Sequence, residues 1–404
     1  MKCSFHYILP ALLALLVSLE SKAQPSPKDA RIKDSIIGWQ DHLTKADTPT
    51  KPFITPYDTF SLHQQRINNL FVQWMQQSYT PVGGLGRYSK YFYYQKNNHY
   101  PHSYGVMFKA YSVGFRYLDA QGHFAGIAET WVPFHVSVNS VNNAWGIYYL
   151  NNDIDYYFTL PEEFYAESRQ NQEVMQKTDP KINPYVHKYL TNVTGFWQTT
   201  YLVPGNKLPI VQLTKGEFLT LTEAAIDRHL ANKKKELEST YRNSPKDVSY
   251  FYNTEVESMS RVRNGIQQLK AKHKSDWNEP AKIRTTQPTL LDFDGSIDPF
   301  DIDKFEQGLN KYGFVYRFEP AAYARCKADK PQWITISIAY AAPSYGNKAY
   351  EMYRSVMEFI NYDYIYNYFF DPEKVKGQPY RPNNEAKQKE ILAGYNSPGK
   401  PASR

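Results

Sequence analysis

A long helical hairpin in the middle of the chain constrains the fold more than any other feature. Thr214 stands where a helix N-cap would stand, and Glu217 follows three residues later. A Thr and a Glu at this spacing form a capping box, in which each side chain binds a backbone N–H group that the helix leaves free. Leu213 and Phe218 flank the box at the positions of a hydrophobic staple. We therefore predict that a helix begins at Thr214.

Apolar residues recur every three or four positions on both sides of the turn Asn243-Ser244-Pro245. Before the turn they are Phe218, Leu221, Ala225, Ile226, Leu230 and Leu237, and after it they are Val248, Tyr252, Val256, Met259, Val262, Ile266 and Leu269. This spacing places each set on one face of a helix. Because the turn between them is short, residues 214–274 should form an antiparallel helical hairpin.

The first 23 residues have the features of a secretory signal peptide. Lys2 provides a positive charge, residues 7–19 are mostly apolar, and Ser21-Lys22-Ala23 is a small-x-small cleavage site. The apolar segment is shorter than the roughly 20 residues of a membrane-spanning helix. We therefore expect cleavage after Ala23 and export to the periplasm or the extracellular space.

The composition of the exported chain argues against an internal disulfide, nucleic-acid binding and a transmembrane helix. Cleavage leaves Cys326 as the one cysteine, so no disulfide can form within the chain. It also leaves 45 Lys and Arg (47 less Lys2 and Lys22) and 39 Asp and Glu (40 less Glu20), a net charge of +6. This surplus is spread along the sequence, so it does not indicate nucleic-acid binding. No later segment predicts a transmembrane helix.

The residues before the hairpin predict an extended lead-in and an α+β domain. Five prolines in residues 24–59 indicate extended structure with at most one short helix near 31–43. Residues 60–213 form the predicted domain, in which one helix lies across an antiparallel sheet. Helical spacing predicts a helix of about 17 residues that ends before Pro81. Its apolar positions are Ile67, Leu70, Phe71, Trp74 and Met75.

Four aromatic and β-branched runs predict the strands of that sheet. They are residues 87–95, 104–118, 124–139 and 144–159. In the third run the even-numbered residues, including Val132, Phe134, Val136 and Val138, share one face. Pro133 in the same run predicts an edge strand or a bulge.

Two turns in this region predict hairpins. Asp119-Ala120-Gln121-Gly122 has the composition of a hairpin turn between the second and third runs. The turn Pro204-Gly205-Asn206-Lys207 predicts that residues 196–203 pair with residues 208–213.

The C-terminal part predicts a smaller unit behind a linker. Residues 275–289 read as a polar linker, and residues 290–373 as a C-terminal α+β unit with a β-hairpin and a helix. The two strands and the helix are predicted at 313–319, 333–340 and 348–360. Residues 374–404 are a polar tail that we expect to be mostly disordered. The fold class is therefore α+β, with a helix on an antiparallel sheet, a central antiparallel helical hairpin, and a small C-terminal β-hairpin plus helix.

Two neighbouring stretches resemble part of a known group of sequences. They are Tyr201-Leu202-Val203-Pro204-Gly205-Asn206-Lys207-Leu208-Pro209 and Leu213-Thr214-Lys215-Gly216-Glu217-Phe218-Leu219. This segment resembles a stretch in uncharacterised secreted proteins of Bacteroidota, in which a Pro-Gly turn and a Leu-Pro pair also precede a Thr-capped helix. The resemblance implies an envelope or secreted location and brings no established activity.

An acidic loop at residues 292–303 is the candidate metal site. Asp292, Asp294 and Asp298 could supply oxygen ligands to a hard cation such as Ca²⁺. The spacing differs from that of an EF-hand loop, because glycine comes fourth rather than sixth and the twelfth residue is Asp303 rather than Glu. The alternative is a solvated loop in which Asp301 or Asp303 caps a helix.

Other motifs give no catalytic site. His99 and His102 lack a third ligand at a metal-site spacing. Gly83-Gly84-Leu85-Gly86 follows a predicted helix and precedes a predicted strand, the reverse of a phosphate-binding loop. The sequence lacks a Gly-x-Ser-x-Gly elbow. Cys326 is interpreted as a core residue rather than a nucleophile. We predict no catalytic residues and no cofactor.

Aromatic content is the remaining unusual feature, with 35 Tyr, 22 Phe and 7 Trp. Rings that face solvent can stack on sugars or contact a protein, and Trp131, Trp145 and Tyr149 are the candidate ligand-binding residues. The alternative is that tyrosine is frequent because it suits half-buried strands. Carboxylates beside aromatics, such as Glu129, also leave open an acid pair of the glycosidase type.

Export, aromatic richness and the lack of a catalytic motif favour a secreted or periplasmic, non-enzymatic binding protein. The alternatives are a hydrolase that acts on an envelope or external polymer with acidic residues, and a structural component of an envelope assembly. The candidate partners are a glycan or an envelope protein. We expect no nucleic-acid partner and no transmembrane segment after signal cleavage.

Overall fold

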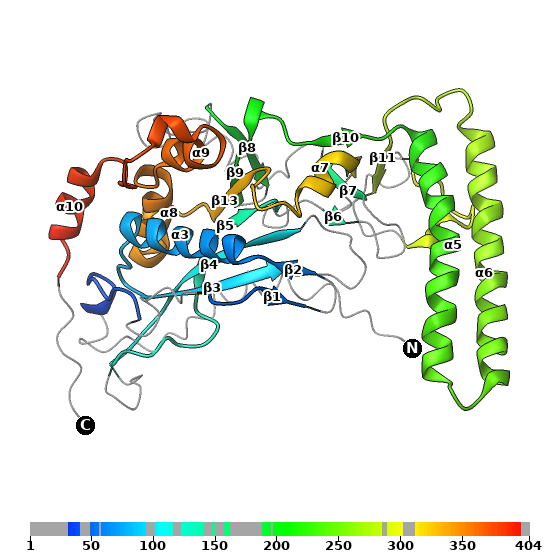
Figure 1. Cartoon of the computed structure of the whole chain (residues 1–404), viewed down its shortest axis with the longest axis horizontal. Helices are drawn as coiled ribbons and strands as arrows, with labels where there is room; N and C mark the ends of the chain where they lie inside the picture. Colours follow the sequence, from blue (N-terminus) through cyan, green and yellow to red (C-terminus); the bar gives the residue numbers. More distant parts are fainter. Residues whose placement is uncertain are drawn as a thin grey trace.

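A computed structural model of the chain shows helices and antiparallel sheets without a regular alternation of strand and helix (Figure 1). It describes residues 31–40, 49–55, 58–93, 102–115, 123–140, 148–149, 157–161, 188–194, 197–284, 289–301 and 312–396. This architecture confirms the predicted α+β class.

A six-stranded antiparallel sheet is the central layer. Its strand order is β3-β4-β5-β13-β9-β8. The strands are β3 (Leu85–Tyr93), β4 (Ser103–Tyr111), β5 (Val132–Val138), β8 (Leu190–Thr194), β9 (Trp197–Leu202) and β13 (Ile334–Ala339). Ile336 in β13 pairs with Val136 on one side and with Thr200 on the other. A strand from late in the chain therefore completes a sheet that begins near its start. A separate two-stranded sheet joins β1 (Phe53–Ile54) to β2 (Thr59–Phe60).

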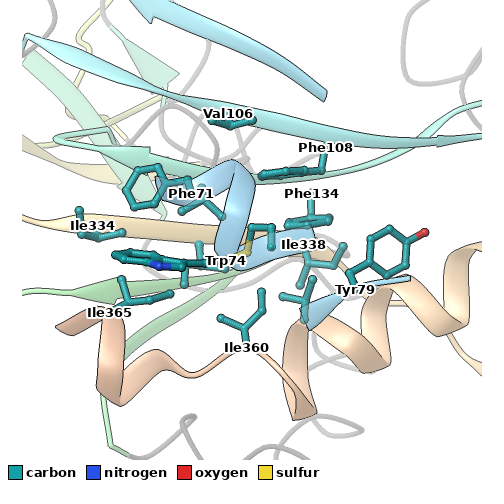
Figure 2. Packing of buried hydrophobic residues seen from close by; sticks show 14 of the residues in the cluster. Phe71, Trp74, Tyr79, Val106, Phe108, Phe134, Ile334, Ile338, Ile360 and Ile365 are labelled. Carbon is teal, nitrogen blue, oxygen red and sulfur yellow. The ribbon is translucent and has the colours of Figure 1, made fainter. Parts of the chain in front are cut away.

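Helices cover one face of the six-stranded sheet. They are α3 (Leu62–Ser78), α8 (Asn347–Glu358) and α9 (Tyr362–Phe370). The even-numbered residues of β4, β5 and β13 point to these helices and are buried, except for the half-buried Val132. Figure 2 shows Phe108, Phe134 and Ile338 of these strands among Tyr79 and Trp74 from α3 and its end. The main hydrophobic core therefore lies between this face and the helices, as the predicted helix-on-sheet arrangement requires.

The sequence at the start of α3 explains where this helix begins. The Ser61 hydroxyl accepts a hydrogen bond from the Gln64 N–H, and the Gln64 side chain accepts one from the Ser61 N–H. This capping box satisfies two backbone donors at the helix end. The helix has 17 residues, which confirms its predicted length, and it buries Phe71 and Trp74 against the core.

A second antiparallel sheet lies beside the first. Its strands are β10 (Ile210–Gln212), β12 (Tyr312–Phe318), β7 (Tyr157–Pro161) and β6 (Tyr148–Tyr149), in that order, and β11 (Lys282–Arg284) also pairs with β12. β11 comes from the predicted linker at 275–289, so the linker contributes a strand. Ala281 and Ile283 within it are fully buried.

The turn at Pro204 connects the two sheets instead of forming a hairpin. Gly205 has the positive φ of 71° that the turn requires, so the turn itself is present. However, β9 pairs with β8 and β13, and β10 pairs with β12. The expected pairing of 196–203 with 208–213 is wrong. All six residues of β9 are buried, and a strand buried on both faces needs two strand neighbours and two covering layers.

The C-terminal strands and helix form at their predicted positions but do not make a hairpin. β12 joins the second sheet and β13 joins the centre of the six-stranded sheet. The expected β-hairpin is replaced because every residue of β13 except Ala339 is buried, so β13 needs partners on both edges. Its neighbours β5 and β9 provide them.

The polar tail is ordered as far as residue 396. It contains α10 (Glu385–Ala393). Tyr380 is buried and stacks on Trp74 with 5.4 Å between ring centroids. The Gln388 amide donates to the Ser78 carbonyl. The expectation of disorder is therefore wrong for residues 374–396. Although this segment is polar in composition, Tyr380 and Gln388 attach it to α3. Residues 397–404 lie outside the described part.

The predicted helical hairpin is confirmed. α5 (Lys215–Thr240) begins with the Thr214–Glu217 capping box, and α6 (Pro245–Lys272) runs antiparallel to it. Figure 1 shows the two helices side by side at the opposite end of the molecule from α10. The halves of α5 and α6 that lie next to their connecting turn carry few buried residues. The core of the hairpin is at the other end, near β11 and the residues that follow β11.

Two smaller expectations need correction. Pro133 lies in an interior strand, but it comes one residue beyond the β13 ladder, which ends at Phe134. Its missing N–H group therefore interrupts no bond to β13. Within the described residues 31–40, helix is present only at 31–32, and Ile36 and Trp39 form bridges to Val82 and Gly86, so the short helix expected near 31–43 does not extend through 33–40; residues 41–43 lie outside the described part. The expected turn at 119–122 lies outside the described residues.

Among the helices that are described, none has the length and apolar character needed to cross a membrane.

Candidate functional site

The side of the six-stranded sheet that faces away from α3, α8 and α9 is polar. Alternate residues of a strand point to opposite faces, so the odd-numbered residues of β3, β4, β5, β9 and β13 lie here. We call this surface the polar face. It includes Arg87, Ser89, Tyr91, Met107, Lys109, Tyr111, Pro133, His135, Ser137, Trp197, Thr199, Tyr201, Thr335, Ser337 and Ala339. Trp131 directly precedes β5, and we count it with this face because its ring centre lies 4.6 Å from the Lys109 ammonium. Leu85, which is also odd-numbered, instead lies in a small apolar cluster with Ile32 and Val113.

One end of the polar face is closed and the other is open. At the closed end Ser137 and Thr335 are fully buried. Tyr201 packs there in a cluster with Phe318 of the second sheet and with Trp333. At the open end Ser89 is exposed, and Trp131 keeps 39% of its surface in contact with solvent. A ligand can therefore reach the polar face from the end where β3, β4 and β5 carry Arg87, Lys109 and Trp131.

His135 lies at the boundary between these two ends. Its side chain is 92% buried, and its Nδ1 atom is buried without a hydrogen-bond partner among the described residues. The rings of Tyr91 and Trp197 lie on either side, with centroids 6.5 Å and 5.8 Å from the imidazole. Burial, together with the charge of Lys109, lowers the pKa of His135 to about 4. The imidazole is therefore neutral at pH 7, with one nitrogen available as an acceptor and one as a donor.

The hydroxyl groups of Thr199, Ser337 and Thr335, deeper in the polar face, are hydrogen-bonded, whereas the Nδ1 atom of His135 is not. The Thr199 and Ser337 hydroxyl oxygens are 2.8 Å apart and share a hydrogen bond. The Thr335 hydroxyl donates to the Ser140 carbonyl over 2.6 Å. Most buried polar atoms in proteins are paired in this way, and a buried atom that is left unpaired destabilises the fold by about 1 to 3 kcal/mol. The unpaired Nδ1 therefore marks a position where a bound molecule would be stabilising.

Two cations face each other at the open end. Arg87 in β3 and Lys109 in β4 are directly paired across the strands, so their side chains lie on the same face. The Arg87 guanidinium lies 5.0 Å from the ring centre of Tyr111, and the Lys109 ammonium lies 4.6 Å from that of Trp131. Within the described part of the chain neither makes an ion pair with a carboxylate. Like charges directly opposite each other are unfavourable, so this end should have a positive potential, and in the described part of the chain aromatic rings lie against both cations.

The sequence-predicted ligand residues are only partly placed. Trp131 lies at the open end of the polar face, over Lys109. Trp145 lies outside the described residues. Tyr149 belongs to β6 by its backbone, and its side chain is outside the described part. Of the three candidate ligand-binding residues, Trp131 is therefore the one whose side chain the structure places on the polar face, beside Lys109.

The acidic loop uses its carboxylates in contacts within the protein. Asp292 caps a short 3-10 helix by accepting from the Thr289 N–H, and Asp294 accepts from the Ser296 N–H. Asp298 binds His273 at 2.8 Å and also pairs with Lys272. The carboxylate of Asp298 is thus already engaged by two side chains of the protein. Among the described residues, no group of three or more His, Cys, Asp or Glu side chains is arranged to hold a metal ion.

The other residues considered from the sequence have structural surroundings. His102 is buried between Asp58, 2.6 Å from its Nδ1, and Gln64, 3.1 Å from its Nε2. Cys326 is fully buried, and burial raises the pKa of its thiol to about 12, which keeps it protonated. His99 lies outside the described residues.

The polar face was not found from the sequence because its members come from five separate strands. Lys109 and Trp131 are 22 positions apart, and Trp197 comes another 66 positions later. One signal was available: the odd-numbered residues of the run 124–139 include Trp131, Pro133 and His135, opposite the apolar even-numbered ones. Pairing across strands, which brings Arg87 to Lys109, cannot be read from that alternation.

Comparisons with known proteins add no relative to this picture. No protein-family model, no curated protein and no solved structure matches the chain.

Proposed function

We propose that this protein is an exported, non-enzymatic binding protein whose ligand lies on the polar face. Export to the periplasm or the extracellular space, with cleavage after Ala23, follows from the signal-peptide features of residues 1–23. A glycan of the surroundings or an envelope protein is the proposed partner. The resemblance to secreted proteins of Bacteroidota supports the same location.

The observation that carries the proposal is the buried, unpaired Nδ1 of His135 behind the exposed ring of Trp131. Binding sites combine apolar or aromatic walls with a few polar atoms that fix orientation. Here Tyr91 and Trp197 flank the imidazole, and Trp131 presents a ring at the opening. These groups are suited to holding a molecule that has both a flat apolar side and hydroxyl groups.

The alternatives receive less support from this surface. A hydrolase of the glycosidase type needs two carboxylates close together. The strand positions that make up the described polar face contain no Asp or Glu. Nothing specific to this fold favours a structural component of an envelope assembly over a binding protein. We therefore propose binding without hydrolysis.

The test is a binding screen with the mature protein and one matched pair of variants. Soluble oligosaccharides are screened by thermal shift and the hits are measured by calorimetry. Trp131→Ala should weaken binding by about three- to tenfold, the loss expected for one aromatic contact. Tyr250→Ala removes an exposed ring on α6, 67% exposed, and should leave the affinity unchanged.

Two results would contradict the proposal. Equal affinity of Trp131→Ala and the unchanged protein for every ligand found would place the site elsewhere. Release of shortened products from an oligosaccharide, lost in an acidic-residue variant, would show an enzyme instead.

A further inference from the structure

We propose that the ligand of the polar face is an anionic carbohydrate, with its acidic group held between Arg87 and Lys109 and one sugar ring stacked on Trp131. This inference rests on the proposed binding function and adds the chemical class of the ligand. Its main support comes from charge and strand register, and the imidazole of His135 enters only as a neutral hydrogen-bonding group.

The position of the two cations is the first argument. Arg87 and Lys109 are nearest neighbours across β3 and β4, on the same face, and no described carboxylate pairs with either. In addition, the Nε atom of Arg87 is buried without a hydrogen-bond partner among the residues described. An arrangement that is unfavourable in the free protein becomes favourable when an anion binds both groups, because charge-assisted hydrogen bonds are the stronger class.

The shape of the row that contains these cations is the second argument. Pro133 pairs with Lys109 and extends the row, and Ala339 and Trp197 form its far end. Pro133 and Ala339 have short side chains and are half-buried, whereas Trp197 at the far end is buried. From β3 to β9 the row crosses four strand spacings, about 19 Å in total. An extended oligomer therefore suits this row better than a single small anion.

The aromatic and neutral polar groups are the third argument, because they separate a carbohydrate from a simple anion. Trp131 has an exposed ring at the same end as the cations. The neutral imidazole of His135 can both accept from and donate to hydroxyl groups. A sugar that carries a carboxylate or a sulfate offers all three partners at once: a ring, hydroxyl groups and a negative charge.

The experiment compares four probes with the mature full-length chain by calorimetry at low and high salt. The probes are an unbranched galacturonate oligomer, a sulfated glucose oligomer, a neutral glucose oligomer of equal length, and a single-stranded oligonucleotide. We expect one or both acidic oligomers to bind at least tenfold more tightly than the neutral one, and salt to weaken this binding. Which acidic oligomer binds identifies the anionic group as carboxylate or sulfate.

Two variants connect the charge preference to the site. Lys109→Gln should weaken binding of the acidic oligomer by about three- to tenfold and leave the neutral oligomer unchanged. Lys234→Gln is the matched control, because Lys234 also lies over an aromatic ring, 5.8 Å from that of Tyr252, but on the hairpin. Arg87→Gln is a second site variant in case Lys109→Gln lowers the thermal midpoint.

The outcomes separate this inference from the function on which it rests. Equal affinity for the neutral and acidic oligomers, with Trp131→Ala still weakening both, would overturn the anionic class and keep the binding site. Binding of the oligonucleotide alone, or of no carbohydrate, would overturn the carbohydrate ligand, and the proposed binding function would then depend on an envelope protein as the partner.

Discussion

Replacement of Gly265 by alanine tests how α6 packs on the loop after η4 (Leu290–Phe293). Gly265 lies in the middle of α6, where alanine ordinarily stabilises a helix by up to about 1 kcal/mol relative to glycine. In this fold, however, an added Cβ would lie 2.2 Å from the Asp294 carbonyl carbon and 2.3 Å from the Gly295 nitrogen. Helix propensity and packing therefore predict opposite signs for the same substitution.

The structure decides which effect is larger. Ordinary van der Waals contact begins at 3.4 Å, so the backbone at Asp294 must move by 3.4 − 2.2 = 1.2 Å to accept the methyl group. The atoms in the way are backbone atoms and cannot rotate aside as a side chain would. The shift would also disturb Phe293, which is fully buried and packs edge-on against Phe218 at 5.8 Å. Overpacking destabilises by about 1 to 3 kcal/mol, and an overlap of 1.2 Å with backbone atoms belongs at the upper end of this range. After subtraction of a propensity gain of up to about 1 kcal/mol, we expect a net loss of about 2 kcal/mol.

The assay is urea unfolding followed by circular dichroism at 222 nm, which is dominated by the helices. Ser260→Ala is the control, since Ser260 is exposed on the same helix and donates only to the Val256 carbonyl one turn earlier. We expect the Gly265→Ala midpoint to fall and the Ser260→Ala midpoint to change little. A midpoint for Gly265→Ala equal to or above that of the unchanged protein would refute the close contact of α6 with this loop.

Two further predictions concern the ordered C-terminal segment and the acid sensitivity of the hairpin. Tyr380→Phe should destabilise the fold by about 1 to 3 kcal/mol, because the phenol oxygen accepts from the Asn361 N–H and shares a hydrogen bond with the buried Ser78 hydroxyl. Tyr364→Phe, which removes a bond to the exposed Gln378 carbonyl, should have a smaller effect, and equal thermal midpoints for the two variants would contradict the packing of this segment. The hydrogen bond from Lys215, opposed by partial burial and aided by His273, lowers the pKa of Asp276 to about 2. A carboxylate with a lowered pKa stabilises the fold above its unfolded pKa of about 4, and this contribution is lost as the pH falls from about 4 to about 2. Asp276→Asn should therefore lower the urea midpoint at about pH 5 and have less effect near pH 2, whereas an equal effect at both values would contradict the ion pair.

Local signals in the sequence predicted the elements well where one short segment decides the structure. Thr214 and Glu217 mark the start of α5 because a capping box involves only neighbouring residues. The same holds for α3 and for the strand positions of β12 and β13. The partners of those strands depend on distant segments, and the turn at Pro204 therefore misled the pairing of β9. The prediction of a disordered tail at 374–396 was wrong because it was based on average composition. A single buried ring, that of Tyr380, is enough to attach the segment to Trp74.

The candidate site was less accessible from the sequence than the fold. Trp131 was nominated from the sequence because aromatic residues are conspicuous there, and its exposure became known from the structure. Arg87, Lys109 and His135 are ordinary residues until the register of β3, β4 and β5 brings them to one face. The acidic loop was conspicuous in the sequence, but its carboxylates bind backbone donors and the side chains of Lys272 and His273. Density of charge in a sequence indicates a site less reliably than a charge that lacks a partner in the fold.

The place of β13 has a consequence for how the chain acquires its structure. The β3–β4–β5 sheet portion and the β8–β9 pair are both complete in the sequence by residue 202, yet the strand that joins them begins at residue 334. As the chain emerges N-terminus first, the edges of β5 and β9 stay unpaired until more than one hundred further residues have appeared. Open strand edges with apolar faces invite pairing between molecules. Synthesis of this protein therefore includes a vulnerable interval, in which a chaperone that shields strand edges would raise the yield of native molecules, and C-terminally shortened chains would aggregate.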